Sequence, residues 1–138
     1  MTFASPPGKT AGDFSHLSVL LVDDEAFAVR LEGAVLKQLG ITDVRVARDG
    51  AEAVRMLEEA GGNIDLVISD WNMPNMSGLE LLRRVRQEQA GIPFIMLTSK
   101  VTEQAVREAV QAGVDGYLAK PFSPSQLRTR IQAILSRR

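Results

Sequence analysis

The sequence contains no cysteine and only one histidine. The absence of cysteine excludes disulfide scaffolds, zinc–thiolate sites, iron–sulfur clusters and thiol catalysis. The single histidine, His16, lies at the edge of a polar N-terminal segment, where a solvated side chain is the expected state. We therefore do not expect this histidine to act as a base or as a metal ligand.

The chain also lacks an excess of charge of either sign and lacks a long apolar run. Sixteen Lys and Arg residues oppose seventeen Asp and Glu residues, giving a formal net charge of −1. No basic field therefore favours nucleic acid or an anionic membrane as the main partner. The longest apolar runs, such as Val19–Val22 and Phe94–Leu97, have four residues, whereas a membrane span needs about 20. Without a secretory signal after Lys9, we expect a cytoplasmic protein with no membrane insertion.

The length of 138 residues, with 45% hydrophobic and 24% charged residues, suits one domain with a single core. Residues 1–15 are rich in Pro, Gly, Ser, Thr and Ala and show no periodicity, which predicts a flexible N-terminal tail. Residues 16–138 are then the folded domain. A second folded domain does not fit, so we expect no output domain.

Short apolar runs of strand length alternate with segments of helical periodicity five times along the chain. Apolar stripes at helical spacing are predicted for the first two helices; they consist of Phe27, Leu31, Ala34, Val35 and Leu39, and of Ala53, Val54, Leu57 and Ala60. The predicted strands are Val19–Val22, Val44–Ala47, Leu66–Ser69, Phe94–Leu97 and Gly116–Leu118.

Capping signals support three of the helices. Ser77 and Glu80 form a capping-box pattern, Thr102 can cap the fourth helix, and Ser123-Pro124 with Gln126 predicts the start of the fifth. Apolar strands separated by helices predict an α/β fold with a parallel sheet covered on both faces. The expected architecture is a flavodoxin-like, doubly wound five-stranded sheet with five helices and strand order 2-1-3-4-5.

Polar residues follow four of the five predicted strands. Asp23 and Asp24 end the first strand, Asp70 ends the third, Thr98 the fourth and Lys120 the fifth. Ligands of open parallel sheets bind at this edge, so these side chains are expected to meet. Clustered carboxylates need a cation, and hard oxygen ligands favour Mg²⁺. Each residue alone could be a solvated loop residue or a cap, but their joint placement predicts a site for a phosphoryl group.

One stretch is more specific than these single residues. Residues 69–82, read as SDWNMPNMSGLELL, are accompanied by Val22-Asp23-Asp24, Leu97-Thr98 and Lys120-Pro121-Phe122. With these motifs the chain, from about residue 17 to residue 138, resembles the receiver domain of two-component response regulators. Among these it is most similar to the stand-alone chemotaxis type.

The resemblance implies a function for each motif residue. Asp70 is implied to accept a phosphoryl group from a phosphohistidine on a sensor histidine kinase or histidine phosphotransfer protein. Mg²⁺ is implied to be held by the side chains of Asp24 and Asp70 and the backbone carbonyl of Asn72, with Asp23 acting through water. Thr98 and Lys120 are implied to hold the phosphoryl oxygens. The chain would then be a signalling switch, with intrinsic self-phosphorylation and autodephosphorylation, rather than an ordinary enzyme.

The resemblance also implies how the signal leaves the site. Tyr117 is implied to turn inward when Thr98 moves, altering a partner-binding face made by the fourth helix, fifth strand and fifth helix. From the residues alone, Tyr117 could equally be a half-buried core aromatic. The Lys120–Pro121 peptide bond is implied to be cis. Because no output domain is expected, the response would pass through protein contact or onward phosphotransfer.

Departures and alternatives accompany the resemblance. Ser77 stands where the family commonly has an acid, and Lys100 and Asn72 occupy positions that in this family tune access of hydrolytic water.

Three alternative functions remain open. They are a phosphorelay intermediate, a phosphate sink and a Mg²⁺-dependent phosphatase of the haloacid dehalogenase type. The segment Gly8-Lys9-Thr10 mimics the end of a P-loop but lacks the preceding glycine and strand. A flavin carrier lacks its phosphate loop after the first strand.

Overall fold

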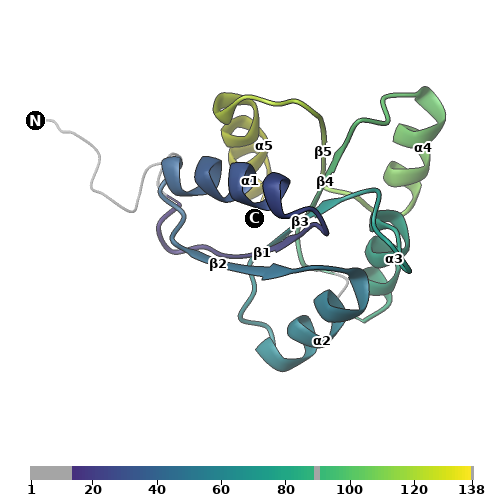
Figure 1. The fold of residues 1–138 in the computed structure, drawn as a ribbon, viewed down its shortest axis with the longest axis horizontal. Coiled ribbons are helices and arrows are strands. Elements are labelled where there is room, and N and C mark those ends of the chain that lie inside the picture. Colours follow the sequence, from purple (N-terminus) through teal and green to yellow (C-terminus); the bar gives the residue numbers. More distant parts are fainter. Residues whose placement is uncertain (1–13, 89–90, 138) are drawn as a thin grey trace, which may run out of the picture.

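The computed structural model describes residues 14–88 and 91–137. Five strands alternate with five helices (Figure 1). The strands are β1 (Ser18–Val22), β2 (Asp43–Ala47), β3 (Leu66–Asp70), β4 (Phe94–Thr98) and β5 (Gly116–Ala119). The helices are α1 (Ala26–Gln38), α2 (Gly50–Ala60), α3 (Gly78–Glu88), α4 (Glu103–Gln111) and α5 (Pro124–Ser136). None of the helices in the described part of the chain is long and apolar enough to cross a membrane.

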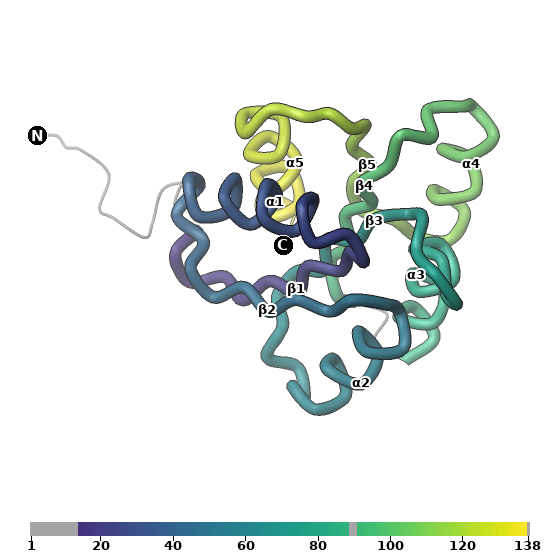
Figure 2. The backbone as a smooth tube through the Cα atoms, in the orientation of Figure 1, coloured from purple at the N-terminus to yellow at the C-terminus, as the bar shows by residue number. Residues whose placement is uncertain are grey.

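The strands form one parallel sheet in the order β2-β1-β3-β4-β5, as the sequence predicts. Strand β1 lies between β2 and β3 in the sheet. The carboxyl ends of β1 and β3 therefore lie next to each other. The backbone tube in Figure 2 shows α1 beside α5, while α2 and α3 lie across the sheet from them. Helices therefore cover both faces of the sheet.

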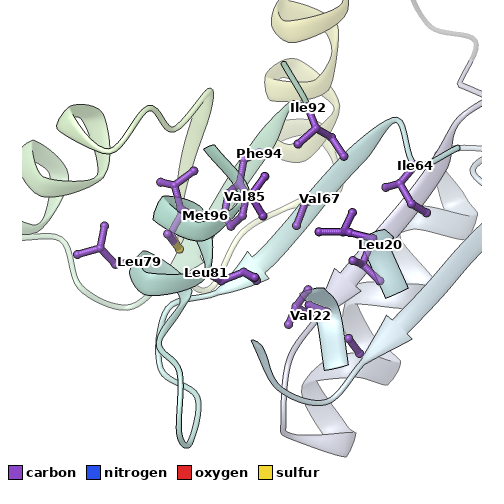
Figure 3. Close-up of a cluster of buried hydrophobic side chains, with 14 of the residues drawn as sticks. Leu20, Val22, Ile64, Val67, Leu79, Leu81, Val85, Ile92, Phe94 and Met96 are labelled. Carbon is purple, nitrogen blue, oxygen red and sulfur yellow. The ribbon is translucent and has the colours of Figure 1, made fainter. Parts of the chain in front are cut away.

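The hydrophobic core is divided between these two faces. On one face, Leu20, Val67 and Phe94 of the central strands pack with Val85 of α3 (Figure 3). The other face packs α1 and α5 against alternate residues of the same strands, among them Leu21 and Ile68. Central strands that are buried on both faces favour apolar residues at most positions, which explains their nearly continuous hydrophobic runs.

The predicted helix starts are confirmed by their hydrogen bonds. The Ser77 Oγ accepts from the Glu80 N–H at 3.1 Å, and the Ser77 N–H donates to the Glu80 carboxylate at 2.8 Å. Ser123 and Gln126 form the same reciprocal pair at α5. The Thr102 hydroxyl accepts from Ala105 N–H at 3.1 Å at α4. These contacts satisfy backbone donors that a helix start otherwise leaves unpaired.

The buried face of α1 differs from the predicted stripe. Phe27 and Leu31 are 60% and 55% exposed, whereas Glu32 and Leu36 are buried. Of the predicted stripe, Leu39 is buried and Val35 is half-buried, whereas Ala34 is exposed like Phe27 and Leu31. The helix is turned so that an acid, Glu32, lies on its buried face. In the predicted α2 stripe, Ala53, Leu57 and Ala60 are buried and Val54 is half-buried.

The N-terminal boundary also shows a difference. Phe14 belongs to the segment predicted as tail, yet it is only 1% exposed and packs with the α1 and α5 side of the core. Its carbonyl accepts from the Leu17 N–H at 3.0 Å. Ordered packing therefore begins several residues before β1. The P-loop-like segment Gly8-Lys9-Thr10 lies outside the described residues.

Candidate functional site

Three aspartates meet at the carboxyl edge of the sheet. Asp23 and Asp24 follow β1, and Asp70 is the last residue of the neighbouring β3. One carboxylate oxygen from each lies within 4.8 Å of the others, in the only such acidic group among the described residues. Asp23 is buried and its Oδ1 accepts from the Glu25 N–H at 3.0 Å, while Asp24 is exposed. Asn72 is exposed in the loop that follows.

The loop between β3 and α3 is closed by backbone hydrogen bonds next to Asp70. The Gly78 N–H donates to the Trp71 carbonyl at 2.7 Å, and the Trp71 N–H donates to the Leu97 carbonyl at 3.0 Å. A side chain at position 78 could not be accommodated, because its Cβ would lie 2.3 Å from the Asp70 carbonyl oxygen. Glycine at the start of α3 therefore allows the helix to lie directly against the end of β3.

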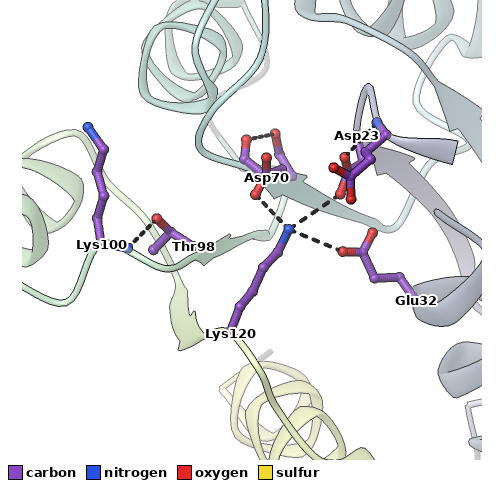
Figure 4. A network of polar contacts seen from close by, with 8 residues as sticks. Asp23, Glu32, Asp70, Thr98, Lys100 and Lys120 are labelled. Carbon is purple, nitrogen blue, oxygen red and sulfur yellow. Dashed lines mark hydrogen bonds and ion pairs between the residues drawn. The ribbon is translucent and has the colours of Figure 1, made fainter. Parts of the chain in front are cut away.

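The Lys120 ammonium group lies among the carboxylates (Figure 4). Its Nζ is 2.8 Å from Asp70 Oδ1, 3.4 Å from Glu32 Oε2 and 3.5 Å from Asp23 Oδ2. The Lys120 N–H donates to the Thr98 carbonyl at 2.9 Å, which ties β5 to β4 at this point. The Lys120–Pro121 peptide bond is cis, as the sequence resemblance implies.

The titration behaviour of these groups reflects burial and mutual charge. Burial opposes the charged form of Lys120, but the hydrogen bond and negative charge of Asp70 raise its pKa overall. Burial raises the pKa of Asp70, and the contact with Lys120 opposes that rise. Each group thus favours the charged form of the other, so Asp70 keeps a cation beside its carboxylate.

Glu32 is a member of this cluster that the sequence analysis missed. Its side chain is buried on α1, and its Oε1 has no hydrogen-bond partner in the described structure. Burial first, and then the negative charge of Asp23, raise the pKa of Glu32 to about 8. The available signal was its spacing, since Val29, Glu32, Leu36 and Leu39 recur at helical intervals along one face.

Thr98 is the last residue of β4, and Tyr117 lies within the neighbouring strand β5. Thr98 is fully buried, and its hydroxyl accepts from the Lys100 N–H at 2.9 Å. The half-buried Tyr117 donates a hydrogen bond from its hydroxyl to the Lys100 carbonyl. The Lys100 ammonium lies 5.4 Å from the centroid of the Trp71 ring, and Trp71 meets Tyr117 edge to face at 6.3 Å. Thr98 is thus linked to Tyr117 through Lys100.

The donor set fits a hard divalent cation. All side-chain donors of the acidic group are carboxylate oxygens, and the exposed Asp24 leaves the group open to solvent. Mg²⁺ binds through one or two carboxylates while keeping several waters. Asp23, Asp24 and Asp70 can therefore hold Mg²⁺ and leave positions for phosphate oxygens.

Comparison with known proteins identifies the family. Residues 19–132 match the family model described as the response regulator receiver domain. The chain belongs to the response regulator receiver family. Receiver domains are switches of two-component signalling, and they bind Mg²⁺ at an acidic aspartate cluster of the kind described above.

Curated relatives of this receiver domain are chemotaxis proteins. It is 39% identical over 123 residues to chemotaxis protein CheY of Pseudomonas aeruginosa, covering 88% of this chain and 98% of that protein. It is 36% identical over 124 residues to chemotaxis protein CheY-3 of Vibrio cholerae, covering 88% and 94% of the two chains. The receiver domain is therefore similar to these CheY proteins over nearly their whole length.

Solved structures agree with this assignment. The CheY of a CheX–CheY–BeF₃–Mg²⁺ complex from Borrelia burgdorferi has a TM-score of 0.82 and 28% sequence identity, covering 86% of this chain and 89% of that chain. A response regulator receiver domain protein from Clostridium thermocellum has a TM-score of 0.81 and 28% identity, covering 88% and 95%. In the Borrelia burgdorferi structure the CheY is in complex with CheX.

Proposed function

We propose that this receiver domain accepts a phosphoryl group on Asp70 from the phosphohistidine of a sensor histidine kinase or histidine phosphotransfer protein. The observation that carries the proposal is the position of the Asp70 carboxylate. It lies 2.8 Å from Lys120 Nζ and belongs to the acidic group with Asp23 and Asp24. An anionic nucleophile is therefore placed beside both a cation and a set of metal ligands.

The transfer needs no general base, because an ionised carboxylate is already nucleophilic. An Asp70 oxygen forms a bond to phosphorus while the bond from phosphorus to the donor nitrogen breaks, and that bonding pair leaves with the imidazole. The product is an acyl phosphate on Asp70. Lys120, whose Nζ already lies 2.8 Å from Asp70 Oδ1, would offset negative charge on the phosphoryl oxygens.

We further propose that the reaction depends on Mg²⁺. Asp24 and Asp70 would bind the ion with the carbonyl of Asn72, and Asp23 would act through water. When bound, Mg²⁺ neutralises charge that develops on the phosphoryl oxygens. The carboxylates of this chain set the position of that ion relative to Asp70. A cytoplasmic location is part of the same proposal.

The outgoing signal is proposed to pass through Thr98 and Tyr117. A phosphoryl group adds acceptor oxygens beside the Thr98 hydroxyl, which now accepts from Lys100 N–H. Movement of Thr98 toward those oxygens would disturb Lys100, whose carbonyl holds the Tyr117 hydroxyl. Tyr117 lies on β5, between α4 and α5, so the face made by α4, β5 and α5 is the proposed surface for a downstream partner.

Intact mass after incubation with acetyl phosphate tests the proposal. The wild type is expected to gain the mass of one phosphoryl group with Mg²⁺ and none after chelation, because Asp70 and its ligands form one site. The Asp70→Asn variant is the matched control; it keeps the shape of the side chain and should gain nothing. Trp71 fluorescence, recorded in parallel, reports on the adjacent site.

Other outcomes of the same experiment would change the assignment. A phosphorylated Asp70→Asn protein would remove Asp70 as the acceptor. Continuous turnover of phosphomonoesters would favour a phosphatase of the haloacid dehalogenase type. Transfer of the group from Asp70 to a histidine protein would favour a phosphorelay intermediate, and rapid loss without any partner response would favour a phosphate sink.

A further inference from the structure

Lys120 contacts two kinds of carboxyl group in this structure. Asp70, at 2.8 Å, is the proposed nucleophile, and Asp23, at 3.5 Å, belongs to the proposed metal ligands. Glu32, at 3.4 Å, belongs to neither group and comes from α1. Figure 4 shows the Lys120 ammonium between Asp70 and Glu32. The Lys120 ammonium therefore contacts the proposed phosphoryl acceptor, Asp70, and a side chain of α1, Glu32, at the same time.

The burial of Glu32 is costly to the fold. Its side chain is 7% exposed, and its Oε1 lacks a hydrogen-bond partner in the described structure. A buried polar atom without a partner destabilises the folded state. The neighbouring positions on the same helical face, Leu36 and Leu39, are apolar and buried, so an apolar side chain suits this environment. The contact with Lys120 is what the acid adds.

The ammonium group of Lys120 has three protons for all of its acceptors. A phosphoryl group on Asp70 brings further oxygens to the side of Lys120 that faces Asp70. Any hydrogen bond from Lys120 to Glu32 then competes with a hydrogen bond to the phosphoryl group. The competing acceptor is a side chain of α1, which contacts α5.

We infer that Glu32 is a positioning residue that retains Lys120 on the α1 side and thereby weakens its hold on a phosphoryl group at Asp70. The inference rests on the proposed function of Asp70 and adds a determinant of phosphoryl affinity. Glu32 itself does not touch the reacting atoms. It acts through Lys120 alone, and this requirement makes the inference testable.

Beryllium trifluoride, titrated at saturating Mg²⁺ and followed by Trp71 fluorescence, measures affinity for a phosphoryl-like group without turnover. Glu32→Leu is expected to bind about three- to tenfold more tightly than the wild type, which corresponds to one lost competing hydrogen bond. Glu32→Gln keeps an oxygen acceptor for Lys120 and should give a clearly smaller gain. Glu32→Met is a second apolar variant with a flexible side chain that fills the same space.

A double-mutant cycle separates action through Lys120 from other effects. In a Lys120→Ala background, Glu32→Leu should leave the affinity unchanged within about twofold, because there is no ammonium to compete for. Glu59→Leu removes one negative charge from an exposed position of α2 and controls for charge alone. It should bind beryllium trifluoride as the wild type does. Urea unfolding of each variant confirms that the folded state is being titrated.

Three results would overturn the inference. They are an unchanged or weaker affinity in both folded apolar variants, an equal gain in Glu32→Gln, and a gain that persists in the Lys120→Ala background. A wild type that binds neither Mg²⁺ nor beryllium trifluoride would overturn the proposed function and this inference together. A wild type that binds both, with apolar variants that match it, would overturn only the role of Glu32.

Discussion

The two edges of the sheet use charged residues in opposite ways. At the amino edge, the Arg86 guanidinium donates to the Gly113 and Ile92 carbonyls at 2.9 and 2.6 Å and to the Asp115 carboxylate at 2.6 Å. Asp115 also accepts from the Phe94 N–H at 2.9 Å. At the carboxyl edge, Lys120 alone is shared among three acids, and Glu32 Oε1 has no partner.

This difference separates charges that hold the fold from charges kept for chemistry. Arg86 satisfies two backbone carbonyls and one acid, so its charge is used to join the loops that precede β4 and β5. The carboxyl edge keeps more negative than positive charge, which favours binding of a cation but destabilises the folded chain without one. The contribution of the carboxyl edge to stability should therefore depend on pH and on bound metal. The contribution of the amino edge should depend on neither.

The largest expected effect concerns pH. The pKa of Glu32 is about 8 in the folded protein and near 4.5 when unfolded, so between these values the folded state binds more protons. The free energy of unfolding of the metal-free protein should therefore fall as pH rises from 5 to 8, by on the order of 3 kcal/mol. Urea unfolding across this range measures the fall. Glu32→Gln should flatten the profile, and an equally steep profile in that variant would contradict the assignment.

A smaller effect is expected at the amino edge. Arg86→Leu removes three hydrogen bonds and leaves Asp115 without its cation, so unfolding should become easier by about 2 kcal/mol. Because Arg86 is remote from the acidic group, Mg²⁺ affinity measured by Trp71 fluorescence should stay as in the wild type. Altered Mg²⁺ affinity in this variant would show that the two edges are coupled.

The smallest expected effect concerns the metal ligands. Asp24→Asn removes one carboxylate from the proposed Mg²⁺ site, and the affinity measured by Trp71 fluorescence should fall by roughly tenfold or more. Asp24 is exposed, so its loss should leave the stability of the metal-free protein equal or higher. Asp49→Asn, at the N-cap of α2, removes an acid that does not belong to the acidic group and serves as the control. Equal Mg²⁺ affinity in wild type and Asp24→Asn would exclude Asp24 as a ligand.

Most of the fold could be predicted from the sequence because local signals agree with one another. Ser77 and Ser123 mark helix starts through capping, and the apolar runs mark buried parallel strands. The approach of Asp23, Asp70 and Lys120 followed from strand order, since the ends of parallel strands share one edge.

The part that could not be predicted concerns tertiary contacts. The spacing of Glu32 places it on a buried face of the helix, but its partner Lys120 is far along the chain, so no local signal identifies their contact. The acid at this position directed the prediction to Phe27 and Leu31, which the helix exposes. The burial of Phe14 is a similar case, since its partners come from α1, α5 and the strands.

The position of β2 at the edge of the sheet has a practical consequence. The side chains of the site come from β1, β3, β4, β5 and α1, so the β2–α2 unit stands beside the site without supplying any of the acids, Thr98 or Lys120. Because the sequence has no cysteine, a cysteine introduced at the exposed Glu59 of α2 would be its only thiol. A fluorescent dye or spin label could therefore be attached there at a single defined point, and its signal would report docking of other proteins without touching the acidic group.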